Sequence, residues 1–226
     1  SDANITYKNL KFFSKGKKIF SKFDVTTNFG KIETIKNIYL PLVGYHNVCN
    51  ALAAISVAIG VGINKNDIKK GLKKFEGVNR RTTIIYNKNN IRVFDDYAHH
   101  PKEITCTIDS IKLITKGKVI IIHQPHRYSR LNFLFREFTH CFNNSDYLFL
   151  MPVYSAGEKK IKNVNSMILS KKIKNCVTCF EANEKKIFKN IKKLVSPGDS
   201  IAFLGAGSIT STAKNFAKFL SYPEEK

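Results

Sequence analysis

The pattern of apolar and polar positions changes character after the first 80 residues. Early in the chain, short apolar-rich runs separated by polar turns are typical of antiparallel strands, and they fall at 5–13, 18–25 and 32–40. An Ala-rich segment then predicts a buried helix at 46–58 that ends near glycines, and helical spacing of apolar residues predicts a second helix at about 66–75.

From residue 82 onward, strand-like and helix-like runs alternate. Strands are expected at 82–86, 91–94, 118–123, 146–151, 177–180 and 200–205. Helices are expected between them, at 101–114, 131–142, 166–173, 184–194 and 208–220. This alternation predicts an α/β protein with a doubly wound, Rossmann-like and mostly parallel sheet in residues 80–226, preceded by a strand-and-helix unit in residues 1–79.

Composition changes this picture little. The chain of 226 residues has 43% hydrophobic residues, including 17 Phe and 9 Tyr, so it is expected to be globular rather than disordered. Its formal net charge of +21 would ordinarily favour nucleic acid or an anionic membrane surface as partner. Nearly all of that charge is Lys, spread over every segment with abundant Asn and Ile, as A/T-rich codon usage also produces. We therefore expect neither a nucleic-acid nor a membrane partner.

The cysteines and the apolar stretches indicate the cellular location to expect for this chain. The five cysteines, an odd number without a signal peptide before them, fit a reducing cytosol, so a cytoplasmic location is expected. The longest apolar stretch, 51–63, is shorter than the roughly 20 residues that a membrane span needs. Residue 1 is Ser and the first methionine is Met151, so we expect the chain to be a fragment, a processed form or an expression product of a longer protein.

Arginine is rare, and two arginines stand three residues apart after one predicted strand. Arg127 and Arg130 could converge on a carboxylate or a phosphate, because guanidinium groups bind such anions through two parallel hydrogen bonds. Loops that follow parallel strands gather at one edge of the sheet, where ligands bind in such folds. Alternatively, the two arginines are solvated surface charges that bind no ligand.

Two further clusters allow more than one interpretation. Asp95, Asp96, His99 and His100 follow another strand and could bind a polar ligand such as a ribose, act as acid and base, hold a metal or cap the next helix. No third metal ligand is evident, so polar ligand contact is favoured.

At the start of the Ala-rich helix, His46 precedes Asn47 and Asn50, which share one helix face. One Asn could be a cap, whereas the second needs a partner such as a nucleobase edge. Gly205 and Gly207 form an incomplete glycine fingerprint, which speaks against a nicotinamide enzyme. No complete phosphate-binding P-loop occurs in the chain.

Together these motifs resemble the ATP-dependent Mur ligases of peptidoglycan synthesis, and most closely the alanine-adding branch of that family. The matching segments are GYHNVCNALAA at 44–54, GVNRR at 77–81, DDYAHHP at 95–101, QPHRYSR at 124–130, VYSAGE at 153–158 and GAGSI at 205–209. They run in the family's order over nearly the whole chain, and the HRYSR segment is specific to the alanine-adding members.

The resemblance implies a three-domain ligase. Residues 1–79 would be the end of its central ATP-binding domain and residues 80–226 its amino-acid-binding domain. The family activates the carboxylate of UDP-N-acetylmuramate with ATP as an acyl phosphate, and the amine of L-alanine then attacks it. The UDP-binding domain, the P-loop and the Mg²⁺ ligands would lie upstream of this chain, so no metal site is expected within it and the chain alone is expected not to catalyse the reaction.

The resemblance also assigns residues. His46, Asn47 and Asn50 would contact the adenine, Asp96 the ribose, and Arg81 the phosphates as a catalytic residue, although Arg80 beside it looks equivalent in the sequence. The alanine carboxylate would be held by Arg127 and Arg130, in a site also lined by Tyr97, His99 and His126.

Two positions depart from the family pattern, and alternatives remain open. Leu131 stands where the family usually has Thr, and Ser208 where it usually has Asp or Asn; Leu131 could slightly alter the anion pocket. Another Mur-type amino-acid ligase is the main alternative function. A basic nucleic-acid-binding α/β domain is the second.

Overall fold

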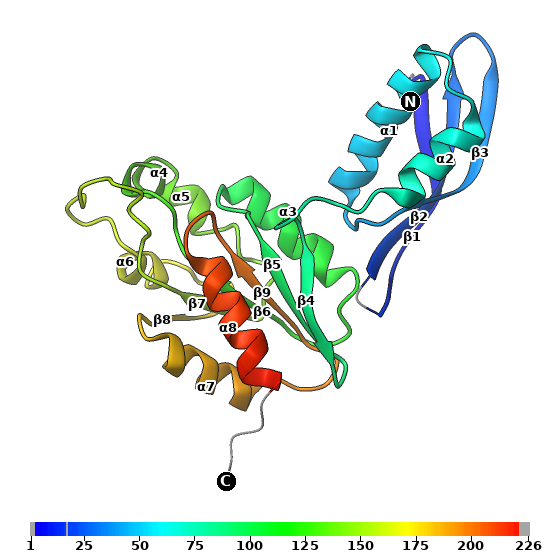
Figure 1. Cartoon of the computed structure of the whole chain (residues 1–226). Coiled ribbons are helices and arrows are strands. Elements are labelled where there is room, and N and C mark those ends of the chain that lie inside the picture. The colour runs from blue at the N-terminus through cyan, green and yellow to red at the C-terminus, as the bar shows by residue number, and fades with distance from the viewer. Residues whose placement is uncertain (1–2, 17, 222–226) are drawn as a thin grey trace. The chain divides into compact units, whose positions relative to one another are not determined.

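The computed structural model describes residues 3–16 and 18–221 of the chain. The chain divides into two compact units, residues 1–78 and residues 79–226, which we call unit 1 and unit 2 (Figure 1). Each unit has a hydrophobic core of its own, as expected for bodies that fold around separate sets of apolar residues.

Unit 1 is a three-stranded antiparallel sheet with two helices. Its elements are β1 (Ile5–Lys15), β2 (Lys18–Asn28), β3 (Ile32–Leu40), α1 (Tyr45–Gly60) and α2 (Lys65–Lys74). Along the central strand β2, every second side chain is buried, including Phe23 and Val25, because one face of an antiparallel sheet packs on a core. Val48, Ala51 and Ile55 of α1 are buried in the same core cluster.

Unit 2 is built on a six-stranded sheet with the order β4-β5-β9-β6-β7-β8. Its strands are β4 (Thr83–Lys88), β5 (Ile91–Asp96), β6 (Val119–His123), β7 (Tyr147–Leu150), β8 (Val177–Phe180) and β9 (Ser200–Leu204). Only β4 runs antiparallel to its neighbour, and the other pairings are parallel. This arrangement confirms the expected α/β class with a mostly parallel sheet.

Helices cover both faces of that sheet. They are α3 (Pro101–Lys112), α4 (Tyr128–Phe133), α5 (Phe135–Phe138), α6 (Ser166–Ser170), α7 (Glu184–Leu194) and α8 (Ile209–Ser221). Figure 1 shows α7 and α8 on the near face and α3 behind the sheet. The near face is packed by Phe188 of α7 and Phe216 of α8 against Ile122 and Phe203, and burial of each such side chain contributes about 1.5–3 kcal/mol.

The single helix expected at 131–142 is wrong in its bounds. The structure has two short helices instead, and α4 begins earlier, at Tyr128. The earlier start has a physical cause, because the backbone N–H of Ser129 donates to the carboxylate of Glu158, 2.9 Å away. Arg130 therefore lies inside a helix, and Arg127 lies at its N-cap with a left-handed backbone (φ 72°).

The ends of the two central strands, β6 and β9, determine where the polar loops begin. Every residue of β6 and β9 is buried, which explains their continuous apolar sequences. Leu204 at the end of β9 pairs with Asp96 at the end of β5 and with His123 at the end of β6. The loops that follow these three strands consequently begin at the same level of the sheet.

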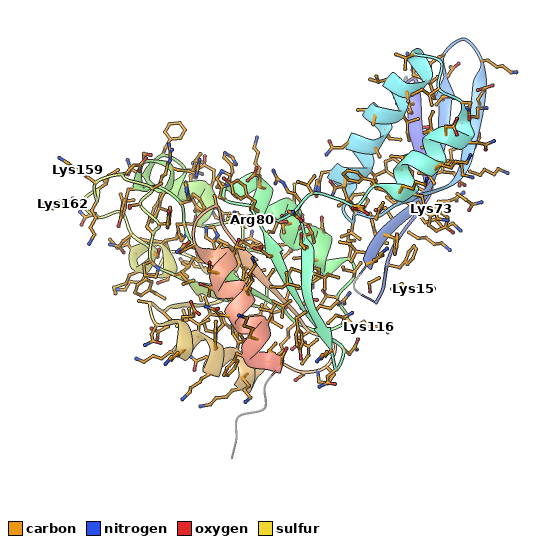
Figure 2. All side chains as sticks on the ribbon, viewed as in Figure 1. Lys15, Lys73, Arg80, Lys116, Lys159 and Lys162 are labelled. Carbon is orange, nitrogen blue, oxygen red and sulfur yellow. The ribbon has the colours of Figure 1, made fainter. Side chains whose placement is uncertain are left out.

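The surface carries scattered lysines rather than one basic stripe. Figure 2 labels Lys15 on β1, Lys73 on α2, Lys116 between α3 and β6, and Lys159 and Lys162 between β7 and α6. Within the described residues, no helix is both long enough and apolar enough to cross a membrane.

Candidate functional site

The candidate site lies on unit 2, at the carboxyl ends of β5, β6, β7 and β9. Asp96 ends β5 and is 1% exposed. Its carboxylate accepts hydrogen bonds from the N–H of Thr82 (2.6 Å), the hydroxyl of Thr82 (3.2 Å) and the N–H of Ala98 (2.7 Å). Burial raises the pKa of Asp96, and these hydrogen bonds oppose the rise. In this structure Asp96 therefore ties residue 82 to the end of β5, and its ribose contact stays a prediction.

The loop after Asp96 brings two predicted site residues together. The Tyr97 and His99 rings meet edge to face with their centroids 5.1 Å apart. Nδ1 of His99 lies 2.9 Å from the carbonyl oxygen of Tyr97 and 3.4 Å from Oε2 of Glu103. The carboxylate of Glu103 also accepts the N–H groups of His99 and His100, which fixes the loop on the first turn of α3.

The loop after β6 carries the arginine pair. Nη1 of Arg130 lies 3.2 Å from Nδ1 of His126 and 3.2 Å from the His126 carbonyl oxygen. Because a guanidinium can only donate, Nδ1 of His126 is the acceptor and its imidazole is neutral. Burial lowers the pKa of His126, and the charge of Arg130 lowers it further. Arg127 is exposed, and its charge contributes to lowering the pKa of Glu158.

His126 connects this loop with the loop after β7. Its ring stacks on Tyr154 with a centroid distance of 5.4 Å and an interplanar angle of 18°. The two residues also form an isolated parallel bridge, and the N–H of Arg127 donates to the Tyr154 carbonyl oxygen at 2.8 Å. The His99 and His126 rings are 6.0 Å apart, so the predicted residues of both loops form one cluster.

Glu158 holds the helix that carries Arg130. Its two carboxylate oxygens accept the hydroxyl of Ser129 at 2.6 Å and the N–H of Ser129 at 2.9 Å. The pKa of Glu158 is lowered first by the Ser129 hydroxyl and then by the Ser129 N–H. Sequence reasoning marked Glu158 only as part of a family motif. Its partner Ser129, 29 residues away, could not be found from local patterns.

The loop after β9 closes the cluster and requires glycine. Gly205 has φ 153°, and a Cβ there would lie 2.9 Å from the Gln124 carbonyl oxygen. A Cβ at Gly207 would lie 2.6 Å from Cγ of Tyr154 and 2.7 Å from Oε1 of Gln124. The glycines of this loop thus let the backbone approach Tyr154 and Gln124 closely, which is a packing role.

Replacing Gly207 by Ala is expected to lower the free energy of unfolding of unit 2 by about 1–3 kcal/mol, because the added methyl group must displace the Tyr154 ring or the Gln124 amide. Urea unfolding of the chain would measure this. Gly157→Ala offers a contrast, since nothing lies within 4 Å of its Cβ, and its φ of 87° is left-handed whereas that of Gly207 is not. The loss in Gly157→Ala therefore reports backbone strain alone, and a loss below about 1 kcal/mol in Gly207→Ala would show that Tyr154 and Gln124 give way to the added methyl group.

The two adjacent arginines before β4 differ sharply. The Arg81 side chain is 50% exposed, and its Nη1 lies 3.9 Å from Oε1 of Glu103. The Arg80 side chain is 27% exposed and points inward, where it donates to the Gly205 carbonyl oxygen at 2.6 Å. Arg81 is thus the one of the two that is available to an anion, as the resemblance implies.

On unit 1, the residues predicted to contact adenine lie in the first turns of α1. His46 and Asn50 are exposed, and Asn47 is half-buried. The Asn47 amide donates to the Val43 carbonyl oxygen at 2.8 Å, a local contact at the start of the helix. The Asn50 side chain makes no hydrogen bond within the described residues and is not among the buried residues of α1. Adenine contact by these three residues stays a prediction.

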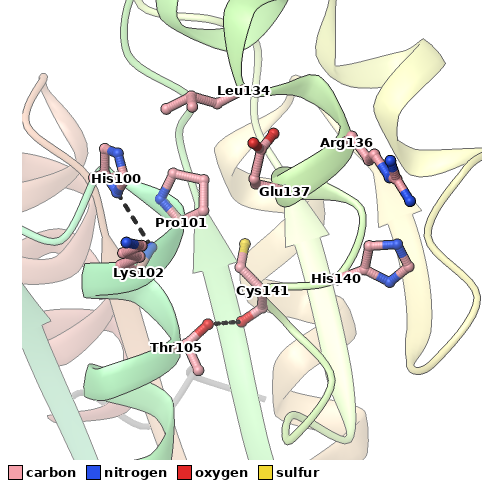
Figure 3. A pocket seen from close by; sticks show the side chains of 9 residues that line it. All are labelled: His100, Pro101, Lys102, Thr105, Leu134, Arg136, Glu137, His140 and Cys141. Carbon is pink, nitrogen blue, oxygen red and sulfur yellow. Dashed lines mark hydrogen bonds between the residues drawn. The ribbon is translucent and has the colours of Figure 1, made fainter.

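A separate hollow of about 700 Å³ lies between α3 and α5 (Figure 3). Its lining comprises His100, Pro101, Lys102, Thr105, Leu134, Arg136, Glu137, His140 and Cys141. Of the candidate residues, His100 lines this hollow, and its side chain caps α3. Across residues 3–16 and 18–221, no group of three or more His, Cys, Asp or Glu side chains is arranged to hold a metal ion.

Leu131, one of the two departures from the family pattern, is a fully buried residue of α4. Its side chain belongs to the core and cannot line the anion site directly. Ser208 donates to Oε1 of Gln124 at 3.4 Å, and its hydroxyl accepts the Gln124 amide at 3.2 Å. Both departures from the family pattern therefore affect residues that hold the loops in place.

Comparison with known proteins agrees with this geometry. Residues 80–207 match the family model described as Mur ligase, glutamate ligase domain. The UDP-N-acetylmuramate--L-alanine ligase of Agrobacterium fabrum is 46% identical over 187 residues, which are 81% of this chain and 40% of that protein. The ligase of the same name from Rhizobium johnstonii is 40% identical over 221 residues, covering 96% of this chain and 47% of that protein.

A solved structure shows the same fold. The crystal structure of the UDP-N-acetylmuramate-alanine ligase of Thermotoga maritima superposes with a TM-score of 0.75 at 26% identity, over 96% of this chain and 46% of that one. This chain spans less than half the length of these relatives. The family model covers more than half of the chain, and the site residues of unit 2 lie inside the matched segment. The chain therefore belongs to the Mur ligase family.

Proposed function

We propose that this chain is part of an ATP-dependent ligase that joins L-alanine to UDP-N-acetylmuramate in peptidoglycan synthesis. The observation that carries the proposal is the cluster of Arg127, Arg130 and His126 at the carboxyl edge of the parallel sheet. The relatives that are 40–46% identical are named for this reaction, and the cluster falls within the segment matched by the family model.

The chemistry of the cluster suits the carboxylate of an amino acid. Arg130 is half-buried, and a guanidinium in such a place binds a carboxylate more strongly than it does in open water. The neutral His126 adds no repelling or competing charge, and its stacking on Tyr154 keeps Arg130 in place. With the carboxylate held there, the amine of alanine is free to attack an acyl phosphate, and phosphate leaves as the peptide bond forms.

ATP would be bound in part by this chain. We propose that Arg81 neutralises phosphate charge, that Asp96 meets the ribose, and that His46, Asn47 and Asn50 meet the adenine. Exposure of Arg81, His46 and Asn50 supports this assignment. The family reaction also uses Mg²⁺. The described residues offer no suitable set of ligands, so no residue of this chain is assigned to the metal.

Unit 1 fits the end of a larger ATP-binding domain. Apolar side chains of α1 and of its C-cap lie outside the core of unit 1, with Val57 67% and Val61 70% exposed. A helix that is apolar around its whole circumference is usually buried on all sides. Contact of these side chains with another part of such a domain would cover them. Because unit 2 holds the arginine cluster and the segment matched by the family model, we propose that it is the amino-acid-binding domain.

A turnover assay tests the proposal. A longer protein that carries this chain would be supplied with ATP, Mg²⁺, UDP-N-acetylmuramate and L-alanine, and release of phosphate would be followed. Phosphate release that requires both L-alanine and UDP-N-acetylmuramate is expected. Turnover by the 226-residue chain alone would contradict the view that it holds only part of the active site.

A further inference from the structure

Arg80 is placed to act on the amino-acid site without touching the substrate. Its side chain is 27% exposed, compared with 50% for Arg81, and its backbone is left-handed (φ 61°). That conformation is uncommon for a residue other than glycine. It turns the Arg80 side chain toward the ends of β5 and β9, while Arg81 faces Glu103.

The Arg80 guanidinium makes two contacts that only a flat cation can combine. Nη2 donates to the Gly205 carbonyl oxygen at 2.6 Å, while Cζ lies 4.6 Å from the centroid of the Tyr97 ring. The Arg80 carbonyl oxygen also accepts the N–H of Tyr97 at 2.7 Å. A lysine ammonium could reach one of these partners. It is not planar and cannot stack on the ring while it donates a hydrogen bond to the carbonyl oxygen.

A continuous row of side chains leads from Arg80 to the anion site. The Tyr97 ring lies 5.1 Å from that of His99, and the His99 ring lies 6.0 Å from that of His126. His126 in turn contacts Arg130 at 3.2 Å. Arg80 joins this row through the Tyr97 ring, because its guanidinium lies over that ring.

The placement of the Arg80 guanidinium is not the one that would give the most stable fold. Nε of Arg80 is buried and has no hydrogen-bond partner among the described residues, and it lies 4.0 Å from Oδ2 of Asp95. A buried donor without a partner is destabilising, and an apolar side chain could fill the same space without that cost. A residue that only packed here would not need a guanidinium.

We propose that Arg80 is a positioning residue that holds the Tyr97 ring in the conformation that binds the amino acid, with its bond to Gly205 fixing the guanidinium over that ring. This inference rests on the proposed function, because it concerns the same site. It assigns distinct roles to two neighbouring arginines. Arg81 would serve the phosphates, and Arg80 would act on the amino acid through Tyr97.

A double-mutant cycle in the longer protein tests this role. Arg80→Lys is expected to raise the KM for L-alanine about tenfold while changing the KM for ATP and the melting temperature little. In a Tyr97→Ala background, the same change is expected to alter the KM for L-alanine less than about twofold, because the ring through which Arg80 acts is gone. Arg136→Lys, at an exposed arginine of α5 outside the site, is the matched control and should have no effect.

Three results would overturn the role. The first is that Arg80→Lys has its full effect in the Tyr97→Ala background. The second is that Arg80→Lys changes the KM for ATP instead of the KM for L-alanine. The third is that Arg136→Lys has the same effect as Arg80→Lys. If Arg80→Lys does not fold, Arg80→Gln takes its place, because its planar amide carries no charge to stack on Tyr97.

A second readout separates this inference from the proposed function. In the 226-residue chain itself, the NMR signals of the Tyr97 and His99 rings should shift in Arg80→Lys and stay fixed in Arg136→Lys. Absence of alanine-dependent turnover in the wild-type longer protein would refute the proposed function. Unmoved ring signals would refute the positioning contact whatever the turnover.

Discussion

Replacement of Arg130 by Ala is expected to lower kcat/KM for L-alanine at least about 100-fold, equivalent to about 2.7 kcal/mol of lost transition-state stabilisation. The half-buried guanidinium would hold the carboxylate and also bonds to Nδ1 and the carbonyl oxygen of His126, at 3.2 Å each. Its loss removes the anion partner and loosens the His126 ring. The exposed Arg127 has no such second role, so Arg127→Ala is expected to cost less.

Steady-state kinetics in the longer protein, with L-alanine and ATP varied separately, would measure this effect. The KM for ATP should remain within about twofold of the wild-type value, because the variant affects only amino-acid binding. Arg136→Ala controls for the loss of one positive charge. A normal KM for L-alanine in Arg130→Ala would remove the carboxylate site from its assigned place.

The second large effect concerns stability in acid. His123 at the end of β6 is completely buried, and burial lowers its pKa to about 3. Its ring packs against Phe138 and Phe142, and Nδ1 lies 2.9 Å from the Leu204 carbonyl oxygen. Nε2 is buried and has no hydrogen-bond partner in the described structure, so a proton added there would create a buried charged donor without an acceptor.

The sign of the pH dependence follows from that lowered pKa. The unfolded chain takes up a proton on His123 near pH 6.5, and the folded chain does so only near pH 3, so stability is complete above pH 6.5 and falls as the pH drops toward 3. A difference of about 3.5 pKa units corresponds to a loss on the order of 4–5 kcal/mol. Burial raises the pKa of Asp95 and of Asp96, which gives the opposite slope.

His123→Phe isolates the contribution of the histidine. The ring is kept, and the Leu204 carbonyl oxygen still accepts the N–H of Gln124 at 3.1 Å, so stability at pH 7.5 should change by less than about 1.5 kcal/mol. Urea unfolding from pH 7.5 to pH 4 should show a smaller loss in the variant than in the wild type. His140→Phe, at an exposed histidine, is the control. Parallel curves for wild type and His123→Phe would show that His123 does not set the acid stability.

Much of the fold was accessible from the sequence because its patterns are local. Alternating and continuous apolar runs locate all nine strands of the described residues, and the strands at 177–180 and 32–40 have the expected bounds. The helix that contains Arg130 was predicted poorly. Its start depends on the carboxylate of Glu158, which comes from a loop after a different strand and leaves no signal near residue 128.

The candidate site, whose ligand contacts stay predictions, was located in the chain by similar reasoning. The rarity of arginine pointed to Arg127 and Arg130, and the order of strands pointed to a shared edge of the sheet for Tyr97, His99 and His126. The difference between Arg80 and Arg81 was not accessible, because it depends on backbone angles and on a contact 125 residues away. His123 reads as one more residue of a buried strand, and only its packing shows why it stays neutral.

The identity of the amino acid is the central question for the proposed ligase, and a competition experiment addresses it most directly. A longer protein that carries this chain would receive ATP, Mg²⁺, UDP-N-acetylmuramate and an equimolar mixture of the natural amino acids, and the product would be identified by mass spectrometry. We expect the alanyl product to predominate and to disappear in Arg130→Ala. A product that carries a different amino acid, or an alanyl product that Arg130→Ala still forms at the wild-type rate, would contradict the assignment.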